Sequence, residues 1–130
     1  MNEPHIHDDP LKDVVDVMLR IKAQAYSVEG ANPRHEHEWM VWKNTKLPEG
    51  KILIPGVIMH HTNVVEHPEL VSWRLQNFAG LVGRENVIAG ADCGFAQFWD
   101  SNRAHPSVQW ARLKSQAEGA ALATTALWRK

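Results

Sequence analysis

The chain has 130 residues, of which 44% are hydrophobic and 22% charged, and its formal net charge is −1 at pH 7. These totals indicate one globular domain and exclude a disulfide scaffold, because a single cysteine cannot form an internal disulfide. Since the charges nearly cancel and no apolar run approaches the roughly 20 residues of a membrane helix, we expect no nucleic-acid or membrane partner. The opening residues, MNEPHIHDDP, lack the basic start and apolar core of a signal peptide, so we expect a cytoplasmic protein.

The first part of the chain predicts a helix, a strand and a short helix. Apolar residues from Pro10 to about Lys22 recur at helical spacing, and proline suits a first helical turn. The short apolar run Ala23–Val28 predicts a buried strand that ends at Glu29, where a Gly- and Pro-containing segment begins. The segment HEHEWMVWKN, residues 35–44, predicts a short helix.

The remaining chain predicts two more strands, each followed by a helix. Lys51–Val57 is an apolar run of strand length after a turn. A helix opens at 67–69 and keeps the 3.6-residue period until Gly83. Residues 86–91 predict the third strand, and after a polar loop a helix runs from Pro106 to about Trp128. Apolar strands that alternate with helices predict an α/β fold with a parallel, helix-covered sheet.

In such sheets, functional residues gather at the carboxyl ends of the strands. A carboxylate, imidazoles and a thiol at that rim are typical of a zinc or acid–base site. The alternative is that the glutamate caps a helix, the histidines line a loop and the cysteine packs as a small apolar group, and the pattern alone does not decide between them. The side chains concerned are Glu29 after the first strand, His60, His61 and Asn63 after the second, and Asp92 and Cys93 after the third.

Other motifs fail on spacing. HEHEW lacks the second histidine of HExxH, so we expect His35 and His37 to be solvated or capping. His5 and His7 are expected to be flexible polar residues, with a weak metal site as the lesser alternative. No dinucleotide fingerprint, Walker loop or GxSxG elbow is present, which also counts against a small flavodoxin-like domain, because that would need a phosphate-binding first loop.

Three stretches together resemble one family. YSVEGANPRHEHEW, LPEGKILIPGVIMHHTNVVEHPEL and GRENVIAGADCGF are similar to the carboxyl-terminal barrel of cobalamin-independent methionine synthases, especially their short single-barrel relatives. The likeness runs from about Pro4 to Trp128. It implies that 1–130 form one partial domain, about strands 6 to 8 with their helices, of a TIM (β/α)8 barrel, whose complete form takes about 250 residues.

The resemblance also implies an activity and its residues. In the family, zinc at the barrel rim activates a thiol, typically homocysteine, to accept a methyl group from a folate. By this resemblance Glu29 and Cys93 are expected to be zinc ligands and His61 the catalytic proton donor. His60 and Asp92, next to these residues, are expected to contact substrate. Alkyl transfer to another thiol such as coenzyme M is the close alternative. The two reactions share the zinc site, and this sequence does not show the site that binds the donor.

One departure affects the whole interpretation. The family's other two zinc ligands lie in a His-x-Cys motif that this sequence lacks, and His5-Ile6-His7 resembles the polar stretch after that motif. The two expected ligands are fewer than the three protein ligands of a usual catalytic zinc. In addition, three strands cut from a closed barrel leave two sheet edges unpaired. We therefore expect a fragment or subunit that self-associates or needs a partner chain to complete the barrel. A non-catalytic remnant is the second class of function.

Overall fold

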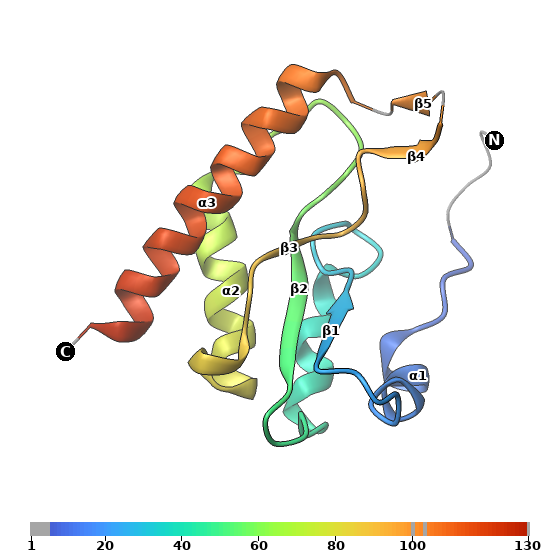
Figure 1. The fold of residues 1–130 in the computed structure, drawn as a ribbon, viewed down its shortest axis with the longest axis vertical. Helices are drawn as coiled ribbons and strands as arrows, with labels where there is room; N and C mark the ends of the chain where they lie inside the picture. The colour runs from blue at the N-terminus through green and yellow to red at the C-terminus, as the bar shows by residue number, and fades with distance from the viewer. Residues whose placement is uncertain (1–5, 100, 103, 130) are drawn as a thin grey trace.

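A computed structural model describes residues 6–99, 101–102 and 104–129. Its sheet has three parallel strands in the order β1-β2-β3, namely β1 (Ala25–Val28), β2 (Ile52–Ile58) and β3 (Gly90–Ala91). Figure 1 shows β2 at the centre, α1 (Leu11–Met18) beyond β1, and two long helices on the opposite side. The predicted α/β fold with a parallel sheet is confirmed.

The long helices begin and end where the sequence predicts. In α2 (Pro68–Val82) the side chain of His67 accepts a hydrogen bond from the amide of Glu69, and Gly83 with φ of 97° ends the helix. Positive φ is a conformation that glycine adopts without steric cost. The last helix, α3 (Pro106–Trp128), is as predicted.

The first helix is shorter than predicted and ends at Met18 rather than at Lys22. The hydroxyl of Tyr26 donates to the carbonyls of Leu19 and Ile21, at 3.2 and 2.8 Å. A tertiary partner for these carbonyls therefore lets the chain turn away early, which helical spacing alone does not predict.

The predicted strand over 86–91 is reduced to β3, and Val87 forms only an isolated bridge to Leu53. Asn86 closes a short 3-10 helix, η2 (Arg84–Asn86), and its side chain donates to the carbonyl of Val82 at 2.7 Å. The segment predicted as a polar loop contains a two-stranded antiparallel sheet, β4 (Ala96–Phe98) and β5 (Ser101–Asn102). The short helix predicted over 35–44 is a 3-10 helix, η1 (Glu36–Lys43).

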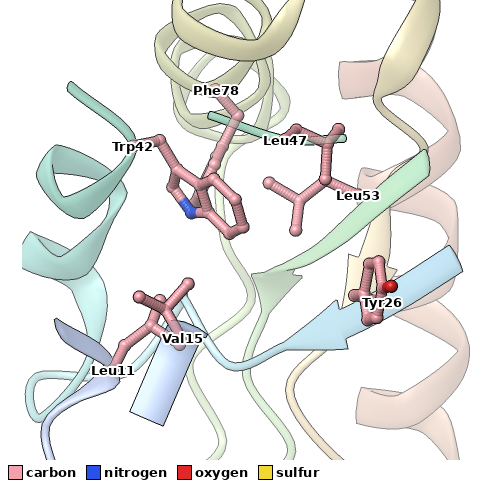
Figure 2. Close-up of a cluster of buried hydrophobic side chains, with 7 residues drawn as sticks. All are labelled: Leu11, Val15, Tyr26, Trp42, Leu47, Leu53 and Phe78. Carbon is pink, nitrogen blue, oxygen red and sulfur yellow. The ribbon is translucent and has the colours of Figure 1, made fainter. Parts of the chain in front are cut away.

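Two apolar clusters hold the layers together. Figure 2 shows the first, which joins α1, η1, α2 and the sheet and consists of Leu11, Val15, Tyr26, Trp42, Leu47, Leu53 and Phe78. The second joins β2, α2 and α3 and consists of Val57, Ile58, Val71, Leu75 and Ala123. These clusters fix the strands relative to one another and so place the loops at their carboxyl ends.

The sheet has two edges. Among the described residues, β1 and β3 hydrogen-bond only to β2. Ile88, just before β3, leaves 55% of its surface exposed. No helix in the described part of the chain combines the length and apolar character needed to cross a bilayer.

Candidate functional site

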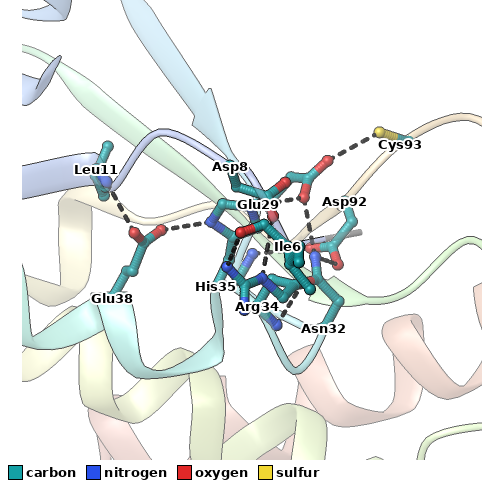
Figure 3. Close-up of polar contacts among 11 residues, drawn as sticks. Ile6, Asp8, Leu11, Glu29, Asn32, Arg34, His35, Glu38, Asp92 and Cys93 are labelled. Atoms are coloured by element: carbon teal, nitrogen blue, oxygen red, sulfur yellow. Dashed lines mark hydrogen bonds and ion pairs between the residues drawn. The ribbon is translucent and has the colours of Figure 1, made fainter. Parts of the chain in front are cut away.

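Glu29 and Cys93 meet at the carboxyl ends of the two outer strands. Glu29 directly follows β1, and Cys93 lies two residues beyond β3. The Sγ of Cys93 donates to Oε1 of Glu29 at 3.2 Å (Figure 3). The structure therefore brings the two predicted ligands together, while their metal-binding role stays a prediction.

This pair fits two neighbouring positions around a zinc ion. Tetrahedral geometry with Zn–S near 2.3 Å and Zn–O near 2.0 Å places sulfur and oxygen about 3.5 Å apart, close to the distance observed between Sγ and Oε1. Within 6–99, 101–102 and 104–129, no group of three or more His, Cys, Asp or Glu side chains is arranged to hold a metal ion. The described residues thus place one thiol and one carboxylate in contact, without a third such side chain arranged to complete a metal site.

Asp92 ties the two outer strand ends together. Its Oδ1 accepts from the amides of Gly30 and Ala31, at 2.8 and 3.0 Å, and its Oδ2 accepts from the side chain of Asn32 at 2.9 Å. The carboxylate is buried and both oxygens are engaged by the loop after β1. The predicted contact between Asp92 and substrate stays a prediction.

His35 lies among three carboxylates, contrary to the prediction of a solvated or capping side chain. It occupies the N-cap position of η1, but its side chain makes no capping bond and is only 14% exposed. Nδ1 lies 2.7 Å from Oε2 of Glu38, and Nε2 lies 3.5 Å from carboxylate oxygens of Glu29 and Asp8. Burial by itself lowers the pKa of His35, but the hydrogen bond to Glu38 and the surrounding negative charges outweigh it and raise the pKa above the ordinary 6.5.

Glu38 also bonds to the beginning of α1. Its Oε1 accepts from the amide of Leu11, the first residue of α1, at 2.8 Å. A carboxylate at a helix N-terminus satisfies an amide and opposes the positive end of the helix dipole. Beside it lies an open pocket of about 160 Å³ whose wall includes Glu29 and His35.

The two predicted histidines lie together on the loop after β2. Their ring centroids are 4.8 Å apart in an edge-to-face arrangement, and His60 is 7% exposed. Nδ1 of His61 is buried without a hydrogen-bond partner in the described part of the chain. The loop is held by Arg112 of α3, a completely buried arginine, which donates to the carbonyls of Met59, His61, Thr62 and Val64.

Of the other predicted residues, Asn63 and His7 are exposed, while His5 lies outside the described residues. Three residues have structural roles at the site that the sequence analysis did not predict: Asn32 and Arg112 were given no role there, and His35 was expected to be solvated or capping. For Asn32 a signal was present, because asparagine before proline favours side-chain bonds to the following turn, and its Oδ1 does accept from the amide of Arg34. Nothing in the sequence marks the tertiary partners of Arg112.

Comparisons with known proteins give a likeness of fold. No family model matches the sequence, and no curated protein matches it. Among solved structures, the chain is similar to a B12-independent methionine synthase from Shewanella sp. W3-18-1, determined in complex with selenomethionine. The TM-score is 0.75 at 18% sequence identity, over 92% of this chain and 32% of that chain. The chain therefore has the fold of about one third of that structure.

Proposed function

We propose that this chain forms the zinc-side portion, about strands 6 to 8, of a methionine-synthase-like barrel that transfers a methyl group from a methyl-folate to a thiol such as homocysteine. The observation that carries the proposal is the 3.2 Å contact between Cys93 and Glu29 at the ends of the outer strands. The fold shared with part of a B12-independent methionine synthase supports it.

Each residue of the pair has a defined part in this chemistry. Cys93 as thiolate and Glu29 as carboxylate would hold the zinc, which when bound supplies positive charge that stabilises the acceptor sulfur as thiolate. A free thiol needs this help, because with a pKa near 8.5 only a few per cent is thiolate at neutral pH. Cys93 is a ligand and not the attacking group.

The reaction needs a proton donor, and the family resemblance gives that role to His61. As the acceptor sulfur bonds to the methyl carbon, the bond from that carbon to the folate nitrogen breaks, the thiol proton is lost and the leaving nitrogen needs a proton. His61 supplies that proton as general acid. Arg112 holds the His61 carbonyl at 2.7 Å and so fixes the backbone from which the imidazole projects. Substrate contacts by His60 and Asp92 remain predictions.

The remaining zinc ligands and the methyl donor's pocket would come from another part of the barrel, provided by a partner chain or by further sequence. Two observations are consistent with this: the ligand set of the described residues is incomplete, and the strands at both edges pair on one side only. The incomplete set also favours a second candidate, a non-catalytic subunit with this fold. The cytoplasmic location stays a prediction.

Zinc content tests the proposal. Elemental analysis of the purified chain, of Cys93→Ser and of Glu29→Gln should find zinc in the wild type and less in both variants, while Glu85→Gln, at an exposed glutamate outside the site, should retain it. Methyl transfer from methyltetrahydrofolate is then measured with homocysteine and with coenzyme M as acceptors. Absence of bound zinc at every concentration would contradict zinc binding by Cys93 and Glu29 and favour the non-catalytic alternative. Transfer to coenzyme M alone would change the proposed acceptor.

A further inference from the structure

Asn32 connects the two acidic side chains at the site. Its Nδ2 donates one hydrogen bond to Oε2 of Glu29 and one to Oδ2 of Asp92, both at 2.9 Å (Figure 3). The residue is 5% exposed. Both hydrogens of this amide group are therefore used to bridge two carboxylates in a place largely closed to water.

The orientation of the Asn32 amide is determined by its surroundings. Its Oδ1 accepts from the backbone amide of Arg34 at 2.9 Å. Rotation by 180° would place Oδ1 against two carboxylates and the NH₂ group against an N–H donor, which replaces three hydrogen bonds by three repulsive contacts. The amide can therefore hold Glu29 in only one way.

Asp92 anchors this bridge to the sheet. Its Oδ1 takes the amides of Gly30 and Ala31, so three hydrogen bonds join the end of β3 to the loop after β1. Gly56 of β2 makes room for this carboxylate, because a Cβ at that position would lie 2.0 Å from Oδ1 of Asp92. The anchor therefore occupies a space that only glycine leaves open.

We propose that Asn32, anchored by Asp92, is a positioning residue that holds Oε2 of Glu29 and thereby presents Oε1 to Cys93. This inference rests on the proposed zinc function. The two oxygens of Glu29 are divided between two tasks: Oε2 is held by the amide, and Oε1 faces the thiol at 3.2 Å. The arrangement orients both donors before a cation arrives, and outer contacts of this kind strengthen metal binding.

Cobalt binding tests the positioning. Titration of the full chain with Co²⁺, followed by the thiolate-to-cobalt charge-transfer absorption, gives the dissociation constant and reports on Cys93 directly. Asn32→Leu removes the bridge without adding charge, and Asn32→Asp keeps the shape but removes both donors. We expect both to bind Co²⁺ about 10- to 100-fold more weakly. Since the added negative charge in Asn32→Asp attracts a cation, weaker binding by that variant reflects lost positioning.

The matched control is Asn86→Asp, which removes an amide donor of the same kind at the end of α2. It should leave Co²⁺ affinity unchanged, with folding of every variant checked by circular dichroism. Wild-type affinity in both Asn32 variants would overturn the inference. A wild type without the charge-transfer band would contradict the proposed zinc function itself.

A measurement without metal tests the positioning role of Asn32 separately from the proposed zinc function. Iodoacetamide reacts with the sulfur of Cys93, and Glu29 engages that sulfur through the 3.2 Å hydrogen bond from Sγ to Oε1. If Asn32 holds Glu29 there, Asn32→Leu should be alkylated faster than the wild type, toward the rate of Glu29→Gln. An unchanged alkylation rate in Asn32→Leu would overturn the positioning role whatever the outcome with cobalt.

Discussion

Arg112 on α3 donates a hydrogen bond of 2.7 Å to the backbone carbonyl of His61, on the loop after β2, although 51 residues separate them in the chain. The same guanidinium reaches the carbonyls of three more loop residues, and its Nε lies 3.7 Å from the buried carboxylate of Glu66. Thr62, within this loop, has a φ of 69°, which is uncommon for a residue with a Cβ. A buried cation thus fixes a strained loop that carries the proposed proton donor.

Loss of Arg112 should destabilise the fold strongly. Arg112→Met keeps an apolar stem but leaves the loop carbonyls and the Glu66 carboxylate without their donor, which we expect to cost about 3 kcal/mol or more of unfolding free energy. Urea unfolding measures this loss of unfolding free energy. Lys114→Met, at an exposed position on the same helix, should change stability by less than about 0.5 kcal/mol. A change below about 1 kcal/mol for Arg112→Met would contradict the role of the arginine.

Two helical glycines should respond to alanine in opposite directions. A Cβ on Gly119 of α3 would lie 2.4 Å from Cβ and Cγ1 of Val71 on α2, so Gly119→Ala should lower the unfolding free energy by about 1–3 kcal/mol. Gly80 of α2 is exposed, and a Cβ there meets nothing within 4 Å, so Gly80→Ala should raise it by about 0.5–1 kcal/mol. Chemical unfolding of both variants checks the signs, and an unfolding free energy that Gly119→Ala leaves unchanged or raises would mean that α2 and α3 do not pack this closely.

His35 should make stability depend on pH. Because the folded-state pKa of His35 is raised, the folded chain binds this proton more tightly than the unfolded chain does. The resulting stabilisation is fully present below about 6.5, the ordinary pKa of histidine, and is lost as the pH rises through the folded-state pKa. The difference in unfolding free energy between wild type and His35→Gln should therefore shrink as the pH rises. His7→Gln, at an exposed position, should show no such trend. If this difference in unfolding free energy grows as the pH rises, the result would contradict the raised pKa of His35.

The free edges of the sheet should drive association. Because β1 and β3 pair on one side only among the described residues, their outer backbone groups can pair with another chain. Sedimentation velocity should show concentration-dependent association of the isolated chain. A lysine beside the β3 edge, Ile88→Lys, should weaken it, whereas Trp110→Lys, which removes a side chain 72% exposed on α3, should not. A monomer at every concentration, with strands well protected from hydrogen exchange, would contradict this.

The order of strands and helices was predictable because each element carries its own local pattern. The 3.6-residue period and the Pro and Gly residues at the ends of α2 are properties of adjacent residues, and they place α2 correctly. The ends of elements that were predicted wrongly depend on residues distant in the chain. The first helix stops just before the carbonyls that accept from Tyr26, and Asn86 lies in the 3-10 helix η2 and not in the third strand.

The sequence by itself determined that a carboxylate, two histidines and a thiol follow consecutive strands, and parallel pairing then requires them to share one end of the sheet. Only the tertiary structure decided how they are held. Asn32 and Asp92 join strand ends about 60 residues apart, His35 lies among three carboxylates, and Arg112 fixes the histidine loop from another helix. The physical reason is range: periodicity and turn chemistry act between neighbours in the chain, whereas hydrogen bonds between buried polar groups depend on which distant segments packing brings together.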